Sequence, residues 1–211
     1  MYETINADNV VMYAIRHYDN PQCEGEKEFE DDLKRFKYIK RLLRKYYDTG
    51  ILKERLLLNH LIVLTTVFVL AVDQWSKYWA VEALSDQTIG VIWKLRFHLT
   101  GNTGFAFSTG QGLGPILGVV ASVIVVVLWR MRSRFSGTVS TVALGLVLGG
   151  ACGNLIDRAV RKPGWGRGAV VDFIDLQFWP VFNVADMAIV IGVLLLSVMM
   201  WLEQRGAKSG A

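Results

Sequence analysis

The stretch FSGTVSTVALGLVLGGACGNLI, residues 135–156, carries no charged side chain. An α-helix rises about 1.5 Å per residue, so about 20 residues cross a hydrocarbon core of about 30 Å. Three other stretches have the same character: Leu56–Val72, interrupted by Asn59 and His60, then Gly112–Trp129, and Phe182–Leu202, which contains Asp186. We therefore predict four transmembrane helices, because a small soluble domain rarely buries four helices of this length.

The composition supports a membrane protein with a charged extension. Hydrophobic residues make up 52% of the 211 residues, and the mean hydropathy is +0.32, above the usual range of soluble domains. Residues 1–55 contain 11 acidic and 11 basic side chains, so the net charge of +4 comes from the apolar remainder. This split excludes a uniform soluble globule and a disordered chain. We also expect no nucleic-acid partner, because the basic residues form no continuous stripe with aromatic residues.

Residues 1–55 are predicted to form an N-terminal cytoplasmic helical extension. Residues 29–47 place apolar side chains at helical spacing, with acids first and bases last, as the helix dipole favours. An amphipathic helix on the inner leaflet and a small helical hairpin packed on itself both fit this pattern, and the hairpin is favoured. Asp48–Gly50 then supplies a helix stop. The extension contains no uninterrupted apolar region of a signal peptide.

The positions of basic residues predict the orientation in the membrane. They gather before the first span and between the second and third spans: Lys40, Arg41, Arg44, Lys45, Lys53, Arg55, Arg130, Arg132 and Arg134. Both termini are therefore expected in the cytoplasm. The bases after the third span would lie outside, and we interpret them as functional or interfacial: Arg158, Arg161, Lys162 and Arg167. The alternating β-branched and aromatic residues of 88–100 predict short strands outside the membrane.

Ionisable residues at the edge of a membrane span are costly and tend to mark function. The first span ends with Asp73-Gln-Trp-Ser-Lys77, in which the acid and the base lie four apart on one helical face. An interfacial pair flanked by Trp75 and Trp79 is an equally good interpretation. Asn102 lies in a glycine-rich segment, where asparagine most often serves the turn itself.

The third span ends with Gly149-Gly-Ala-Cys-Gly-Asn-Leu-Ile-Asp-Arg158. Gly145, Gly149 and Gly153 recur every four residues and predict the close approach of another helix. Asn154 and Arg158 share a face, and Asp157 is turned away from it. The planar donor fork of an arginine suits the binding of a carbonyl or an ester.

Two acids are expected to meet beyond the third span. Asp172 lies within the apolar extended run Gly168–Asp175, and Asn183 and Asp186 share a face at the start of the fourth span. The connection through Pro180 is short enough to bring the two carboxylates together. Two facing carboxylates in a low dielectric share one proton, so the pair offers a base and an acid. Such a pair can activate water against an amide and protonate the leaving nitrogen.

No metal or cofactor is predicted. Cys23 and Cys152 form neither a disulfide framework nor a Cys-x-x-Cys site. The three histidines lie in separate segments and are interpreted as structural or exposed: His17, His60 and His98. The chain has no His-x-x-x-His and no Gly-x-Ser-x-Gly motif.

Taken together, these clusters resemble lipoprotein signal peptidase (signal peptidase II), a family of bacterial membrane aspartic peptidases. The resemblance covers about residues 56–205. Its motifs occur in family order: Asp73-Gln-x-x-Lys77, Asn102-x-Gly-x-Ala-Phe107, Gly149-Gly-x-x-Gly-Asn-x-x-Asp-Arg158, Val170-Val-Asp-Phe173 and Phe182-Asn-x-Ala-Asp186.

The resemblance implies a reaction and a set of site residues. Such enzymes remove the signal peptide of a prolipoprotein just before its diacylglyceryl-modified cysteine, without metal or cofactor. Asp172 and Asp186 would form the catalytic dyad, and Asp157 would be structural, bonding neighbouring backbone. The substrate and the dyad would be oriented by Asn154, Arg158 and Asn183. The pocket would be completed by Asp73, Lys77 and Asn102.

The resemblance also implies a fold and a location. The fold is that of a mainly α membrane protein, with four transmembrane helices, a small extracytoplasmic β-cradle and a short outer helix. Residues 1–55 would be the cytoplasmic extension, 56–205 the peptidase domain and 206–211 a short cytoplasmic tail. The active site would face outward from a bacterial cytoplasmic membrane, next to membrane lipid, in a monomer. The family normally begins a few residues before its first span, so the extension is a departure with no assigned role.

Two other classes of function are compatible with part of the pattern. A proton-coupled transporter could use Asp172 and Asp186 as relay groups. It would spread its acids through the depth of the bilayer, whereas these acids cluster at one end of the spans, and no internal repeat is visible. An inactive scaffold that binds lipoprotein precursors is left open by the sequence.

Overall fold

The computed structural model describes residues 50–104, 114–162 and 168–209, together with isolated positions between 34 and 44. The predictions for the helix at 29–47, for Phe105–Phe107 and for Arg167 lie outside the described residues. The chain divides into two units, 1–57 and 58–211. The second unit contains the elements that matter for the site.

The first long helix is α3, Ile51–Ala83, which follows Gly50 at a positive φ of 74°. It is longer than the predicted span Leu56–Val72, which ended where the polar residues begin. The helix continues through Asp73 and Lys77 because these two side chains are fully buried and form an ion pair of 2.9 Å. A polar residue at helical spacing thus marks an interior contact here and not the end of the helix.

Three more helices follow, each overlapping a predicted span. They are α4, Gly114–Arg130, then α5, Thr138–Val160, and α6, Val184–Ser209, with the short 3-10 helix η2, Arg132–Arg134, between α4 and α5. Within the described residues, α3, α5 and α6 are long and apolar enough to cross a membrane, and α4 is a shorter apolar helix of 17 residues. The chain is therefore a mainly helical, multi-pass membrane protein with three or four apolar helices.

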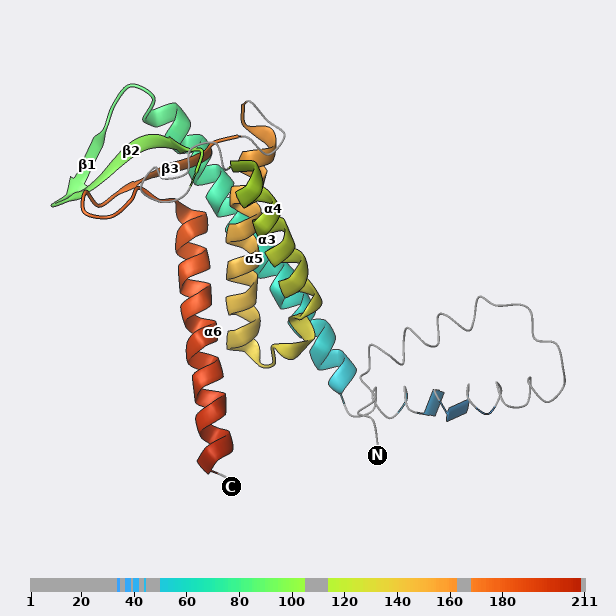
Figure 1. The fold of residues 1–211 in the computed structure, drawn as a ribbon. Helices are drawn as coiled ribbons and strands as arrows, with labels where there is room; N and C mark the ends of the chain where they lie inside the picture. Colours follow the sequence, from blue (N-terminus) through green and yellow to red (C-terminus); the bar gives the residue numbers. More distant parts are fainter. Residues whose placement is uncertain are drawn as a thin grey trace, which may run out of the picture. The chain divides into compact units, whose positions relative to one another are not determined.

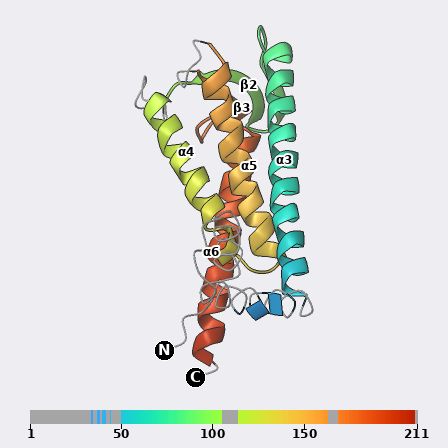
Figure 2. The ribbon, with the colours of Figure 1, turned by 90° about the vertical axis from the view of Figure 1, so that its right-hand side faces the viewer.

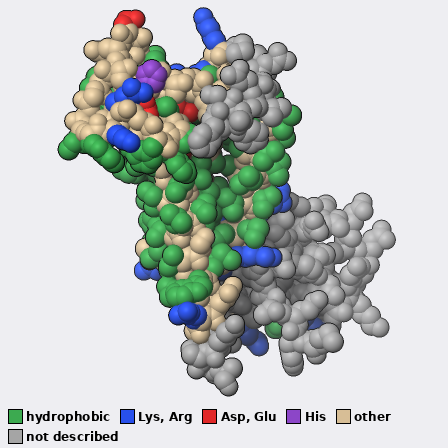
Figure 3. Space-filling view, turned by 60° about the vertical axis from the view of Figure 1, so that its left-hand side comes forward, with side chains coloured by type: hydrophobic (Ala, Val, Ile, Leu, Met, Phe, Trp, Pro, Cys, Tyr) green, Lys and Arg blue, Asp and Glu red, His purple; other side chains and the backbone are tan. Residues whose placement is uncertain are grey.

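The outward faces of these helices are apolar. Phe68 on α3, Val119 on α4 and Leu194 on α6 are each at least 60% exposed. Figure 3 shows hydrophobic side chains covering the helices along most of their length. Exposure on this scale would drive a soluble protein to aggregate, whereas lipid tails accommodate it.

Helix α5 is the most enclosed of the four and packs between α3 and α4 (Figure 2). The predicted close approach is confirmed, because a Cβ added at Gly145 would lie 2.6 Å from Thr65 Cβ and one at Gly149 would lie 2.7 Å from Val69 Cβ. A different face of α5 meets α6, where Gly150 lies against the carbonyl of Ala185. Glycine therefore lets α5 approach two helices at backbone distance.

Beyond one end of the helices lies a three-stranded antiparallel sheet in the order β1-β2-β3 (Figure 1). Its strands are β1, Ile89–Ile92, β2, Leu95–Asn102, and β3, Val170–Asp175. The strands predicted within 88–100 are confirmed. The sheet packs on the last turns of α3 through Ala80, Leu84, Val171 and Phe173, with Trp79 edge-on to Phe97 at 5.4 Å between ring centroids.

Candidate active site

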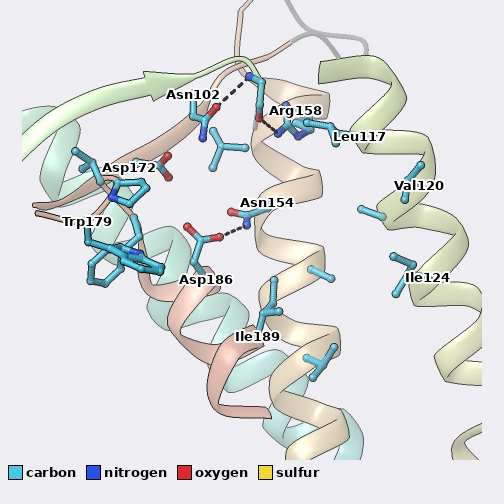
Figure 4. Close-up of a pocket in the computed structure, with 18 residues that line it drawn as sticks. Asn102, Leu117, Val120, Ile124, Asn154, Arg158, Asp172, Trp179, Asp186 and Ile189 are labelled. Atoms are coloured by element: carbon cyan, nitrogen blue, oxygen red, sulfur yellow. Dashed lines mark hydrogen bonds between the residues drawn. The ribbon is translucent and has the colours of Figure 1, made fainter. Parts of the chain in front are cut away.

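The two acids singled out in the sequence line one cavity of about 490 Å³. Asp172 stands in β3, with 3% of its surface exposed, and Asp186 lies in the first turn of α6. The chain between them folds back, because the carbonyl of Phe182 accepts hydrogen bonds from the backbone N–H of Phe173 at 3.1 Å and of Ile174 at 2.9 Å. This return places the start of α6 beside β3, as the short connection through Pro180 predicted (Figure 4).

Asn183 links the two acids. Its Oδ1 accepts the backbone N–H of Asp186 at 2.9 Å, and Asp186 Oδ2 accepts the backbone N–H of Asn183 at 3.2 Å. This reciprocal pair is a capping box, in which both side chains satisfy free N–H groups at the helix start. The Asn183 amide nitrogen is left to donate to Asp172 Oδ1 at 2.6 Å. Sequence reasoning missed the cap, although an Asn followed three residues later by an acid before an apolar run is its signal.

A buried cation supports the dyad from the side of α3. The Lys77 Nζ donates to Asn154 Oδ1 at 3.0 Å and forms ion pairs of 2.9 Å with Asp73 and Asp157. Asn154 in turn donates from Nδ2 to Asp186 Oδ1 at 2.8 Å. Because Lys77 and Asp73 are fully buried, they are not the interfacial pair that the sequence had left possible.

Asp157 connects α5 to the sheet and to α3. Its Oδ2 accepts the backbone N–H of Val171 at 3.1 Å, which confirms the predicted bond to nearby backbone. It also pairs with Lys77 and, at 2.9 Å, with Arg161, two ionic contacts that the sequence did not indicate. Arg161 is one of the bases after the third span that the sequence led us to interpret as functional or interfacial, and the structure shows it in an ion pair with Asp157.

Arg158 lines the cavity with its guanidinium group. Its side chain is 9% exposed, and Nη2 donates to the carbonyl of Gly104 at 3.4 Å. Its Nη1 is buried and has no hydrogen-bond partner among the residues that the structure describes. Asn102 also lines the cavity, and its Oδ1 accepts the backbone N–H of Gly104 at 3.0 Å, as expected for turn chemistry. Figure 4 shows Arg158 and Asn102 converging on this turn from α5 and β2.

The eight residues predicted for the site form two layers. Five line the cavity: Asn102, Asn154, Arg158, Asp172 and Asp186. The other three lie fully buried behind its wall: Asp73, Lys77 and Asn183. The sequence placed Asp73 and Lys77 in the pocket itself. The structure places them one layer deeper, because each ends in a contact with another buried polar group.

The remaining cavity wall is apolar. It is formed by α4, α5, α6 and the loop after β3, chiefly Leu117, Val120, Ile124, Ile189 and Trp179 (Figure 4). Sequence reasoning did not single out these residues, since apolar side chains in a span equally suit lipid contact. In the described part of the chain, no group of three or more His, Cys, Asp or Glu is placed to hold a metal ion.

The electrostatics of the site favour one proton on the dyad. Burial raises the pKa of Asp172, and the nearby Asp186 charge adds to the effect, while hydrogen bonds from Asn183 and Asn102 oppose it. The result is a pKa of about 7 in place of 3.8. Near neutral pH, the pair can therefore hold one acid and one base.

Comparison with known proteins identifies the family. The profile of the family described as signal peptidase (SPase) II matches residues 65–202, well over half of the chain. The chain is 43% identical over 133 residues to the lipoprotein signal peptidase of Mycobacterium avium, covering 62% of this chain and 73% of that protein. The protein belongs to the signal peptidase II family. Its members are proteases, so the resemblance noted in the sequence is confirmed.

Further comparisons agree with this family. The lipoprotein signal peptidase of Rhodococcus jostii is 43% identical over 148 residues, with 67% of this chain and 74% of that protein covered. A solved bacterial membrane enzyme, determined by the in meso method at 2.3 Å resolution, matches with a TM-score of 0.59 and 29% identity. That match covers 68% of this chain and 88% of the solved chain.

A second family profile covers the N-terminal part. It describes a family of unknown function and matches residues 1–93. The match overlaps the signal peptidase II profile over 65–93, which includes Asp73 and Lys77. The extension and the first long helix thus share one sequence family, while the helix also belongs to the peptidase.

Proposed function

We propose that this protein is a membrane aspartic endopeptidase that removes signal peptides from diacylglyceryl-modified prolipoproteins, cleaving before the lipidated cysteine. The observation that carries the proposal is the pair Asp172 and Asp186, joined through Asn183 and facing one cavity. The pKa of about 7 for Asp172 supports it, since one carboxyl then keeps its proton at neutral pH. Membership in signal peptidase II supplies the substrate class.

The dyad would perform the hydrolysis without a covalent intermediate. The ionised carboxylate takes a proton from water, and the resulting hydroxide attacks the carbonyl carbon of the scissile amide. The carbon–nitrogen bond then breaks, and the protonated carboxyl gives its proton to the leaving nitrogen. Arg158 would bind a substrate carbonyl with Nη1, which has no hydrogen-bond partner among the described residues, because a buried unpaired donor is costly unless a ligand satisfies it.

The apolar wall would receive the lipid-modified side of the substrate. Leu117, Val120 and Ile124 on α4 face the two acids across the cavity (Figure 4). Acyl chains and an apolar signal peptide gain free energy on such a surface. The site would thus hold an apolar substrate on one side while the dyad and Arg158 bind its backbone on the other.

We further propose four spans with both termini in the cytoplasm and the site at the outer face of a bacterial cytoplasmic membrane. The end of α4 at Arg130 and the connection to α5 with Arg132 and Arg134 lie at the opposite end of the helices from the sheet (Figure 1). Basic residues at that end favour a cytoplasmic position. The peptidase domain would be 56–205, with 1–55 an extension, 206–211 a tail, and the enzyme a monomer.

The test is cleavage of a lipid-modified prolipoprotein by the purified protein in detergent with a chelator present. Asp172→Asn and Asp186→Asn should each lower kcat at least about 1,000-fold, because either change removes the acid–base pair. Asp175→Asn is the matched control, since Asp175 lies in the same strand and pairs with Arg96 outside the cavity. Full cleavage by either dyad variant would overturn the assignment, and a well-folded parent without activity would favour the scaffold function.

A further inference from the structure

The dyad shares one proton, and the buried contacts around it indicate which carboxyl holds that proton. This inference rests on the proposed function, because it concerns the roles of Asp172 and Asp186 in the hydrolysis. Its starting point is Lys77, which lies behind the cavity wall and is completely buried. A buried lysine that does not touch the cavity has to act through its neighbours.

The three N–H groups of Lys77 have three oxygen acceptors. These are Asp73 Oδ2 and Asp157 Oδ2, both at 2.9 Å, and Asn154 Oδ1 at 3.0 Å. An ammonium group only donates, so the oxygen of the Asn154 amide must face Lys77. The nitrogen of that amide is thereby directed to Asp186 Oδ1, at 2.8 Å. Lys77 thus fixes the orientation of Asn154, together with the Asn183 amide nitrogen that donates to the same oxygen at 3.3 Å.

Both oxygens of Asp186 consequently accept hydrogen bonds. Oδ1 accepts from Asn154, and Oδ2 accepts from the backbone N–H of Asn183 at 3.2 Å. Both donors are groups that cannot accept a proton in return, so they favour the ionised carboxylate. Asp172 also accepts an N–H, from the Asn183 amide at 2.6 Å, but it is 3% exposed in β3, whereas Asp186 lies in the first turn of α6, where the helix N-terminus favours a negative charge. The environment of Asp172 favours the neutral acid.

We propose that Lys77 is a positioning residue that holds the negative charge of the dyad on Asp186 and leaves the proton on Asp172. Asp186 is then the base that takes the proton from water, and Asp172 is the acid that protonates the leaving nitrogen. Charged groups reach this network from four elements: Asp73 on α3, Asp157 and Arg158 on α5 with Arg161 just after its end, Asp172 on β3 and Asp186 on α6.

The test is the pH profile of kcat/KM for two variants with opposite expected shifts. The first is the double variant Asp73→Asn/Lys77→Met, which removes one charge of each sign. Its new amide oxygen at position 73 can still accept the hydrogen bond from the backbone N–H of Ala185 that Asp73 Oδ1 accepts at 2.9 Å. Loss of Lys77 removes the shorter of the two hydrogen bonds that orient the Asn154 amide, so the acid limb should move at least about one pH unit higher. We expect a fall in kcat at nearly unchanged KM, because Lys77 does not line the cavity.

Asp73→Asn alone is the matched control. It keeps Lys77 and removes a negative charge that acts on Asp186, so the acid limb should stay or move to lower pH. A purely structural role of Lys77 would lower activity at every pH alike. An unchanged profile in the double variant, or an upward shift in Asp73→Asn, would overturn the inference.

A spectroscopic measurement tests the proton position without activity. The infrared difference spectrum between the resting parent and Asp172→Asn, at about pH 6, should show the loss of a protonated carboxyl band. Loss of an ionised carboxylate band in its place would overturn the assignment. An inactive parent would refute the proposed function and leave this readout intact, whereas an active parent with the wrong band refutes only the inference.

Discussion

At the scale of a single residue, Asp172 shows most clearly that a group suited to the proposed chemistry can lower the stability of the fold. The strand buries its carboxyl beside apolar neighbours and within the field of Asp186, and both effects disfavour its charge. An ordinary strand would place an apolar residue at this position. The fold therefore accepts a destabilising group where the proposed reaction needs an acid, as is common at functional sites.

Asp172→Asn should accordingly stabilise the fold in a pH-dependent way. The pKa of Asp172 is raised in the folded state, so its stabilising contribution is complete below about pH 4 and is lost as pH rises toward 7. A rise from 3.8 to about 7 corresponds to on the order of 4 kcal/mol at high pH. Thermal unfolding in detergent should show Tm of the variant above that of the parent at about pH 8, with the difference shrinking at about pH 5.

Asp175→Asn is the control with the opposite sign. Burial alone would raise the pKa of Asp175, but the hydrogen bond from Arg96 at 2.6 Å and its charge hold that pKa below the usual range. Its stabilising contribution is present above the unfolded pKa and is lost as pH falls. The variant should be slightly less stable at neutral pH, by about 1 kcal/mol or less, since Arg96 is 42% exposed. Parallel pH profiles for both variants would contradict this account.

At the scale of elements, the glycines of α5 determine how closely the helices pack. Gly149→Ala should destabilise the protein by about 1–3 kcal/mol, because the added Cβ would lie 2.7 Å from Val69 Cβ and 2.9 Å from the Thr66 carbonyl oxygen. Without this steric contact, alanine would stabilise the helix by about 1 kcal/mol relative to glycine, so a decrease in the stability of the variant would indicate tight packing at this position. Thermal unfolding in detergent measures the effect. Gly118→Ala is the matched control, since among the described residues its Cβ would meet only Arg158 Cδ at 3.8 Å, and an equal loss there would contradict the packing explanation.

The sequence predicted the elements well where the pattern is local. Apolar runs located the helices, alternation located strands near 88–100, and the small-residue spacing on α5 predicted the close approach of another helix. The length of α3 was not predictable in this way, because Asp73 and Lys77 interrupt the apolar run and so indicated its end. Only the fold shows that Lys77 is buried against Asp157 on α5. A local sequence pattern does not predict the burial of polar residues whose partners lie far away in the sequence.

The same limit applies to the site. Residues three or four apart, such as Asn154 and Arg158, were correctly placed on one face, and the short connection brought Asp172 to Asp186. The bonds that join α3 to α5 and α6 span many residues of sequence and follow from packing alone. The apolar wall on α4 was also missed, because the residues that bind an apolar substrate and those that contact lipid have the same chemistry.

At the scale of the whole molecule, the polar and apolar groups are sorted by position along the helices. Within the described residues, the dyad, its buried supports and the sheet lie at one end, and the basic connection between α4 and α5 lies at the other (Figure 1). A membrane-embedded hydrolase needs this arrangement, because water and a polar transition state must be reached from an aqueous face. It also explains why the acids do not spread through the depth of the helices as a proton relay would require.

Deleting residues 1–50 should leave the hydrolysis intact. Every residue assigned to the dyad, its supports or the cavity lies between Asp73 and Ile189, α3 begins at Ile51, and the signal peptidase II profile begins at residue 65. The shortened protein should cleave the lipid-modified prolipoprotein with kcat/KM within about two-fold of the parent, equivalent to less than about 0.5 kcal/mol. Membrane insertion and thermal unfolding are compared in the same preparation. A loss above about ten-fold in a well-folded, inserted protein would show that the extension acts on the peptidase, and would give a role to the sequence family that spans residues 1–93.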